Sequence, residues 1–204
     1  MQIDPEQTPS AAYKVLIGCV VPRPIAWVSS MSSDGVLNLA PFSFFNAVCS
    51  NPPTVMFSAG SREGVAKDTV RNVKNTGEYV VNVVNDALVE QMNLSSGEYA
   101  PEVDEFALAG LTSAPCVKVK PPRVAEAPIS MECRMTQTIP VGNEGYYVVL
   151  GEIVHFHIAD DVYEAETGRI NMERLKPVGR LAGNWYTHVN DLFEIVRPNP
   201  NYRG

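Results

Sequence analysis

Short runs rich in β-branched and other apolar residues recur along the chain, separated by prolines, glycines and polar turns. Runs of this length and composition are typical of β-strands. The predicted strands are residues 15–21, 25–30, 36–40, 54–58, 78–84, 129–139 and 146–158. Gly142-Asn143-Glu144-Gly145 separates the last two, so we expect these strands to form a hairpin.

Two segments change to a helical period. In residues 67–76 the apolar side chains lie three apart, Asp68 or Thr69 can cap the start, and Gly77 can end the helix. Residues 86–96 repeat this pattern. Many strands, few helices and no strand-helix-strand repetition predict a mainly β, antiparallel barrel, and they disfavour a doubly wound parallel sheet.

No composition shift, internal repeat or low-complexity tract divides the 204 residues. A chain of this length can bury one sizeable core, so we expect a single domain over residues 1–204. The polar, proline-containing ends, residues 1–12 and 197–204, are expected to be extended or frayed.

The overall charge is negative, with 16 Lys and Arg against 23 Asp and Glu and a net charge of −7. Such a field repels nucleic acid and anionic membranes, although a locally positive pocket can still hold an anion. No run approaches the roughly 20 apolar residues of a membrane span, the first residues lack a secretory pattern, and the four cysteines are dispersed. We therefore expect no nucleic-acid partner, no membrane association and a cytoplasmic location.

Residues 38–46 place polar side chains within an apolar stretch. Asn38 and Asn46 stand at its ends, and Ser43 follows an Ala-Pro break in its middle. Buried polar groups need hydrogen-bond partners. A planar heterocycle rimmed with carbonyls and ring nitrogens can supply them, with the neighbouring aromatic rings covering its faces. A strand that ends in a proline turn explains the same residues equally well.

A second group of residues suits a phosphate. Lys67-Asp68-Thr69 brings a cation, a hydroxyl and free backbone N–H groups to a predicted helix start. A capped surface helix with a solvated lysine is the commoner explanation of such a segment taken alone. Further candidates for the phosphate end are Ser29, Ser30 and Arg62. Neither the glycine pattern of dinucleotide folds nor the phosphate loop of nucleotide hydrolases occurs.

Two histidines lie two residues apart on a predicted strand. His155 and His157 would face the same side and can be regarded as a pair of metal ligands. No third ligand is evident nearby in the sequence, so an outward strand face is the preferred interpretation. We therefore predict no metal site, and no Ser-His-Asp constellation is present to predict a catalytic residue.

In their order and spacing these blocks resemble the flavin reductase-like, FMN-binding split-barrel family. The blocks are Arg23-Pro24, Asn38-Leu39-Ala40-Pro41-Phe42-Ser43, Pro52-Pro53 and Lys67-Asp68-Thr69. The similarity is close over residues 15–84 and continues more loosely to Gly179-Arg180-Leu181-Ala182-Gly183 and Tyr186. The resemblance implies a six-stranded antiparallel Greek-key split barrel with a few short helices, and a homodimer with FMN near the subunit interface.

The residue chemistry above and the resemblance together predict a set of FMN-binding residues. These are Arg23, Trp27, Ser29, Ser30, Asn38, Ala40, Pro41, Phe42, Ser43, Asn46, Arg62, Lys67, Asp68, Thr69 and Arg180. Arg23 and Arg180 can instead hold a dimer together. The implied reaction passes hydride from NADH or NADPH to the flavin and needs no acid or base, because the cofactor supplies the reactivity.

The same resemblance leaves three functions open. The protein can be a flavin reductase that serves a monooxygenase partner, or an FMN-binding flavoprotein without reductase turnover that acts as an electron store, a sensor or a structural protein. The third alternative is a structural or interaction domain that binds no flavin. Folds of this kind share a pocket and differ in chemistry.

Overall fold

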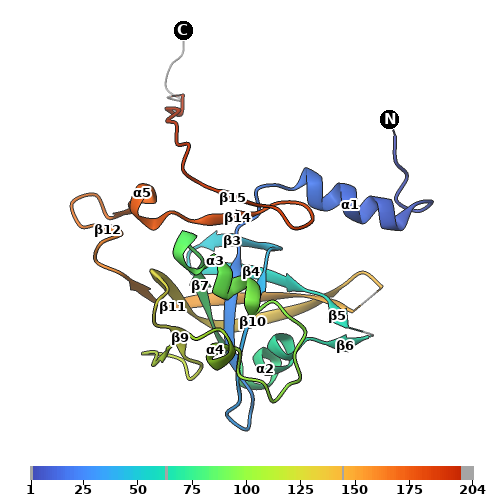
Figure 1. Cartoon of the computed structure of the whole chain (residues 1–204), viewed down its shortest axis with the longest axis horizontal. Coiled ribbons are helices and arrows are strands. Elements are labelled where there is room, and N and C mark those ends of the chain that lie inside the picture. Colours follow the sequence, from blue (N-terminus) through green and yellow to red (C-terminus); the bar gives the residue numbers. More distant parts are fainter. Residues whose placement is uncertain (1, 63, 144, 199–204) are drawn as a thin grey trace.

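The computed structural model describes residues 2–62, 64–143 and 145–198 (Figure 1). Within these residues seven strands form one antiparallel sheet in the order β2-β1-β7-β10-β11-β4-β3. Their bounds are β1 Ala26–Met31, β2 Leu37–Phe42, β3 Phe45–Ser50, β4 Pro53–Ala59, β7 Glu78–Val83, β10 Ile129–Val141 and β11 Tyr146–Ile158. The predicted hairpin of the last two long strands is confirmed by their pairing.

The two edge strands of this sheet are consecutive in the chain and are joined by a short turn. The edge strands β2 and β3 are separated only by Ser43 and Phe44, and the Ser58 backbone N–H donates to the Phe44 carbonyl at 2.8 Å. The sheet must therefore curl round on itself, as a barrel does. Counted as one bent strand, β2 and β3 give the six strands that were expected, and the mainly β, antiparallel prediction is confirmed.

Side chains of the curled sheet pack on both of its faces because successive residues of a strand point in opposite directions. One cluster includes Phe42, Phe57 and Tyr79 and takes in Val70 and Val73 of α2 (Asp68–Thr76). A second cluster on the other face joins Trp27 and Leu39 to Met92 and Phe106 of the short helices. Strands β1 and β2 contribute buried side chains to both clusters.

The predicted helices are present, with shorter bounds. α2 ends at Gly77, whose φ of 73° is the left-handed cap conformation that glycine adopts without strain. Residues 86–96 divide into a turn of 3-10 helix, Asp86–Leu88, and α3, Val89–Leu94. Two further short helices are α4 Glu105–Leu108 and α5 Met172–Leu175. The short strands are β5 Ser61–Arg62, β6 Val65–Ala66, β8 Ser113–Ala114, β9 Arg123–Val124, β12 Tyr163–Glu164, β13 Arg169–Ile170, β14 Val178–Arg180 and β15 Tyr186–His188.

The prediction for the start of the chain is wrong. Residues 15–21 were expected to be a strand and 1–12 to be extended, whereas Pro9–Cys19 forms the helix α1. Proline is favoured in a first helical turn because its missing N–H is not needed there. Of the predicted extended end 197–204, residues 199–204 lie outside the described residues. No helix in the described part of the chain is both long and apolar enough to cross a membrane.

Candidate functional site

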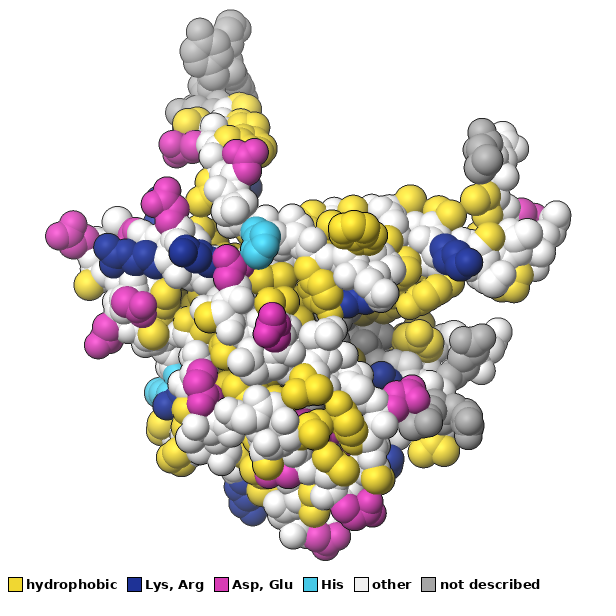
Figure 2. Space-filling model, in the orientation of Figure 1, with side chains coloured by type: hydrophobic (Ala, Val, Ile, Leu, Met, Phe, Trp, Pro, Cys, Tyr) yellow, Lys and Arg dark blue, Asp and Glu magenta, His cyan; other side chains and the backbone are white. Residues whose placement is uncertain are grey.

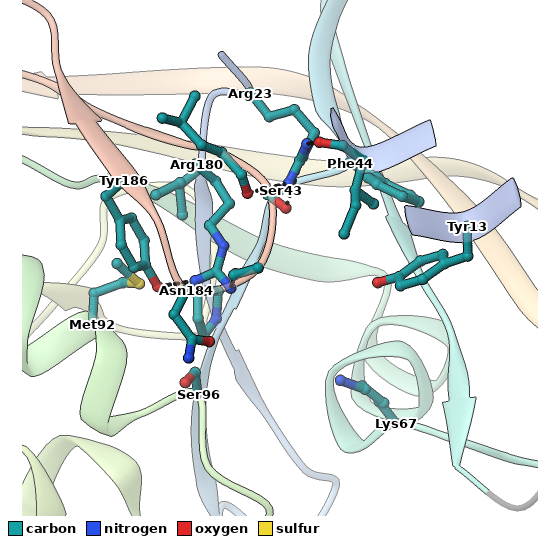
Figure 3. Close-up of a pocket in the computed structure, with 15 residues that line it drawn as sticks. Tyr13, Arg23, Ser43, Phe44, Lys67, Met92, Ser96, Arg180, Asn184 and Tyr186 are labelled. Atoms are coloured by element: carbon teal, nitrogen blue, oxygen red, sulfur yellow. Dashed lines mark hydrogen bonds between the residues drawn. The ribbon is translucent and has the colours of Figure 1, made fainter. Parts of the chain in front are cut away.

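Two adjoining cavities lie beside the turn between β2 and β3. The larger, of about 500 Å³, is bounded by α1, this turn, Arg23 and the hairpin of β14 and β15 (Figure 3). The smaller, of about 350 Å³, is bounded by β2, the start of α2, the segment 95–101 and Glu105. Pro41, Lys67 and Ser96 line both, so the cavities form one cleft with two compartments. Both volumes fall within the roughly 300–1,000 Å³ of small-molecule sites.

The two compartments differ in charge. The larger cavity is lined by Arg23, Lys67 and Arg180 and, among the described residues, by no Asp or Glu. The smaller cavity shares Lys67 and adds Arg71, but it also contains Asp68, Glu98 and Glu105. The larger cavity is therefore locally positive in a chain whose net charge is −7.

Arg23 holds the wall of the larger cavity. Its guanidinium donates to the Ile17 and Val20 carbonyls at 2.6 and 2.8 Å. These carbonyls stand at the C-terminal end of α1, where the last carbonyls lack helical partners. It also donates to the Leu181 carbonyl at 2.9 Å and to the Ser43 hydroxyl at 3.3 Å. Burial, followed by the nearby Arg180 charge, lowers the pKa of Arg23.

Arg180 lies opposite α1 in the same cavity (Figure 3). Its guanidinium donates to the Tyr186 hydroxyl and the Gly183 carbonyl and lies 4.5 Å from the centroid of the Tyr186 ring. Backbone hydrogen bonds in both directions, 2.8 and 3.0 Å long, join Arg180 to Arg23. The barrel and the C-terminal hairpin thus place two guanidinium groups on one cavity.

The start of α2 forms one end of the smaller cavity. Asp68 pairs with Arg71, and the buried Thr69 hydroxyl accepts a hydrogen bond from Asn38 Nδ2 at 2.9 Å. Lys67 is the N-cap residue, and within the described residues no side-chain cap hydrogen bond forms there, so the predicted capping by Asp68 or Thr69 is wrong. The first N–H groups of a helix have no partner within it. They remain available, beside Lys67, to an anionic ligand.

Glu105 stands in the wall of the smaller cavity. Its Oε2 accepts a hydrogen bond from the Leu39 backbone N–H at 3.0 Å. Burial raises the pKa of the Glu105 carboxyl, and the Leu39 hydrogen bond opposes that shift only in part. Ser95, also in this wall, accepts a hydrogen bond from Trp27 Nε1 at 2.9 Å.

Comparison with known proteins identifies the family. The sequence model described as "Flavin reductase like domain" matches residues 17–175. The chain belongs to the flavin reductase-like family. A protein of Aquifex aeolicus is 45% identical over 175 residues, which cover 85% of this chain and 88% of that protein.

Two solved structures resemble this chain, one in sequence and fold and one in fold alone. Nitrilotriacetate monooxygenase component B from Bacillus cereus has a TM-score of 0.92 and 40% identity, over 96% of this chain and 98% of that one. A split-barrel domain protein of Shewanella frigidimarina has a TM-score of 0.84 at 21% identity, over 97% and 100% of the two chains, and this likeness concerns the fold alone. The resemblance to this family and the split-barrel fold, both expected from sequence, are confirmed.

The fold of this flavin reductase-like chain brings together many of the predicted FMN-binding residues. Those that line the cleft are Arg23, Asn38, Ala40, Pro41, Ser43, Lys67, Asp68, Thr69 and Arg180. They come from the β2 segment, the start of α2 and the C-terminal hairpin, and Arg23 comes from the link between α1 and β1. Their role in binding FMN stays a prediction.

The other predicted residues are not among those that line the two cavities. Trp27, Ser29 and Ser30 are fully buried. The Ser29 hydroxyl donates to the Pro122 carbonyl at 2.6 Å, and the Ser30 hydroxyl accepts from Asn72 at 3.2 Å. Trp27 stands behind Ser95, Phe42 packs in the barrel core, and Asn46 is exposed on β3. The side chain of Arg62 lies outside what the structure describes.

Several cleft residues were not predicted. They include Tyr13, Phe44, Ser96, Asn184 and Glu105. Tyr13, Ser96 and Glu105 come from segments that carry none of the family blocks. Only the fold brings these segments to the cleft, so no local sequence signal indicates them. Phe44 lies in the stretch 38–46 and Asn184 follows Gly183, so these two stand next to predicted residues.

The interpretation of His157 as an outward surface residue is wrong. Its Nε2 lies 2.6 Å from Oε1 of Glu132, which is fully buried. That carboxylate also accepts the backbone N–H groups of residues 117, 118 and 119. A potential ligand atom of Cys116 lies within 4.8 Å of those of both residues. These hydrogen bonds explain the buried Glu132 carboxylate, which anchors the loop of residues 117–119.

Proposed function

We propose that the protein is an FMN-binding oxidoreductase that transfers hydride from NADH or NADPH to the flavin. The observation that carries the proposal is the uncapped start of α2, with Lys67 beside it at the junction of two cavities. This is the arrangement that a ligand with a phosphate at one end and a planar ring at the other requires. Membership of the flavin reductase-like family supports the same ligand class.

The residues present fit FMN. The first N–H groups of α2 and the Lys67 ammonium would hold the phosphate. Pro41 and the Ser43 hydroxyl, in the larger cavity, would face the ring. Arg23 Nε donates to that hydroxyl, which fixes its orientation. The bound flavin supplies the hydride chemistry, and the chain supplies position and a sheltered pocket.

The absorbance spectrum of the purified protein tests the proposal. FMN should give a yellow protein or, when added, a raised melting temperature, and FAD should bind less tightly. Anaerobic addition of NADH or NADPH should then bleach the flavin absorbance. Firm FMN binding with no bleaching by either nucleotide would favour the electron store or sensor. A colourless protein whose melting temperature ignores FMN would contradict the binding itself.

We also propose that the protein forms a homodimer. None of the residues of α1 is fully buried, and Tyr13, Val15 and Leu16 are 41–53% exposed. Figure 2 shows hydrophobic side chains on the surface over this helix. The C-terminal segment extends away from the barrel in Figure 1 and exposes Phe193 by 83%. Exposed apolar surface of this extent favours a protein partner, and light scattering behind gel filtration should give twice the monomer mass.

A monooxygenase is the further partner that we propose. The similar protein of Bacillus cereus is named as a component of nitrilotriacetate monooxygenase. A reductase of that kind supplies reduced flavin to a separate oxygenase. Oxygenase activity that depends on this protein together with NADH would support the partnership, and reduced flavin that never reaches an added oxygenase would contradict it.

A further inference from the structure

The larger cavity has more positive charge than its own residues neutralise. Arg23, Lys67 and Arg180 all line it. Within the described part of the chain, none of the three forms an ion pair with a carboxylate. Like charges held together in a cleft attract anions from solution. A ligand that carries a negative group would relieve this repulsion.

The three cations are not equivalent. Arg23 is 5% exposed and already donates four hydrogen bonds to the chain, so it is a positioning residue of the wall. Lys67 stands where the two cavities meet, beside the proposed phosphate site. Arg180 is the cation of the larger cavity that remains for another ligand.

The geometry of Arg180 suits the recognition of a planar anion. Its two hydrogen bonds within the described residues go to uncharged groups, the Tyr186 hydroxyl and the Gly183 carbonyl. The remaining N–H donors of a guanidinium form a rigid fork that matches a carboxylate or phosphate. Stacking on the Tyr186 ring holds the fork in place. Figure 3 shows open space between this side chain and Tyr13 and Lys67 on the far wall.

The surroundings of Arg180 also select for an aromatic body. Tyr13, Phe44 and Tyr186 line the larger cavity with Ile17 and Met92. Aromatic and apolar side chains of this kind cover the faces of a planar ring. The cavity therefore combines an anion-binding group with ring-binding walls.

We propose that the larger cavity binds the second substrate of the flavin, an anionic molecule with a planar ring, and that Arg180 binds its negative group. This inference rests on the proposed function, which places the FMN phosphate at α2 and the ring near Pro41 and Ser43. Two sources share this chemistry. One is an aromatic carboxylate that accepts electrons, and the other is the phosphate-bearing nicotinamide nucleotide.

Benzoate and benzamide test the inference because they have the same shape and differ in charge. Each is titrated into the FMN-loaded protein while the flavin absorbance is followed. Benzoate should bind about tenfold more tightly, because its carboxylate forms charge-assisted hydrogen bonds with Arg180 that a neutral amide cannot form. Arg180→Gln should remove this preference, and Arg180→Lys should retain part of it. Arg169→Gln, exposed and outside both cavities, is the matched control.

The preference for benzoate over benzamide separates ligand recognition from a structural defect, because a damaged pocket would weaken both ligands alike. Equal affinities in the native protein, or a preference that survives Arg180→Gln, would overturn the inference. A protein that fails to bind FMN in the first step would instead contradict the proposed function.

Steady-state kinetics identify the source of the anion. If Arg180→Gln raises the KM for NADH or NADPH about tenfold and benzoate competes with that nucleotide, the nucleotide phosphate occupies the site. If those KM values stay within about twofold while the benzoate preference is lost, the site belongs to a carboxylate acceptor. Either result supports anion binding by Arg180.

Discussion

The two compartments of the cleft are lined by different kinds of side chain. The larger is lined by cations and aromatic rings brought together from α1, the β2–β3 turn and the C-terminal hairpin. The smaller is lined by β2, the start of α2 and the segment 95–101, and it contains acidic as well as basic side chains. Asp68 pairs with Arg71, Asn38 donates to Thr69, and Glu105 accepts from the Leu39 backbone, so many of its polar groups have partners within the chain. A compartment whose charges are balanced within the chain can be stable when empty. One whose charges are unbalanced is better suited to exchange an anionic ligand.

Replacing Arg23 should have the largest effect and would show how much of the larger compartment depends on one side chain. Arg23→Gln removes donors from the end of α1, from Leu181 and from Ser43. Hydrogen bonds from a charged group are each worth about 1.5–3 kcal/mol, so we expect the free energy of unfolding to fall by about 2–4 kcal/mol. Urea denaturation measures this.

Arg180→Gln is the comparison for this variant, because Arg180 lines the same cavity and makes fewer bonds to the chain. Its loss of stability should be clearly smaller. Equal losses for the two arginines would remove the distinction between a wall residue and a ligand residue.

Lys67 belongs to both compartments, and its replacement should weaken FMN more than any change on one side only. Lys67→Ala removes one charge-assisted contact to the phosphate, worth about 1.5–3 kcal/mol, or about 10–100-fold in Kd. Quenching of FMN fluorescence measures the affinity. Lys14→Ala, exposed on α1 and outside both cavities, should bind FMN as the native protein does. The same Kd in both variants would contradict the phosphate assignment.

Replacing Thr69 tests whether the polar groups of the smaller compartment depend on hydrogen bonds to one another. Thr69→Val keeps the shape but leaves the buried Asn38 amide without its acceptor. An unsatisfied buried donor costs about 1–3 kcal/mol, and we expect about 1–2 kcal/mol of lost stability with FMN affinity within about threefold. Thermal unfolding and FMN titration measure the two effects. Thr69→Ser, which keeps the hydroxyl, should lose less stability, and a large loss of FMN affinity without loss of stability would assign the hydroxyl to the ligand.

The difference between the compartments also explains what the sequence could predict. The smaller one is formed by contiguous motifs, so Asn38, Lys67 and Thr69 were recognised from residues 38–46 and 67–69. The larger one depends on α1, which the apolar residues 15–21 wrongly predicted as a strand. In the described structure most of this run belongs to α1 and pairs with no strand. Arg23 donates hydrogen bonds to the backbone carbonyls of Ile17 and Val20 at the end of that helix. Tyr13 could therefore not be placed in a pocket.

The barrel itself was predictable because its long strands, such as β7, β10 and β11, are local runs rich in β-branched and aromatic residues, and β11 also alternates between more and less buried positions. The positions of buried polar residues were not. Ser29 and Ser30 looked like phosphate ligands, but the strand alternation and the pairing of β1 with β2 and β7 bury both hydroxyls among internal partners. Hydrogen-bond partners from distant segments leave no trace in local sequence.

The smallest expected effect concerns Glu105 and the pH dependence of the smaller compartment. Burial raises the pKa of this carboxyl, so the native state holds the proton at a higher pH than the unfolded chain does. The associated stability is fully present below the ordinary value of about 4.5 and is lost as the pH rises through the raised pKa. Glu105→Gln keeps an oxygen acceptor for Leu39 and has no charge to desolvate. Relative to the native protein it should gain stability between pH 4.5 and neutral, by less than about 1 kcal/mol.

Urea denaturation at pH 5 and pH 7.5 measures the gain, with Glu166→Gln, exposed and outside both cavities, as the control. Asp68 and Asp104 also raise the pKa of Glu105, after burial. Loss of the Glu105 charge should therefore make the smaller compartment less negative and tighten FMN slightly. If Glu105→Gln is instead less stable than the native protein at these pH values, the ionised carboxylate stabilises the fold. The charges of the smaller compartment would then be balanced by pairing with cations and not by partial protonation of Glu105.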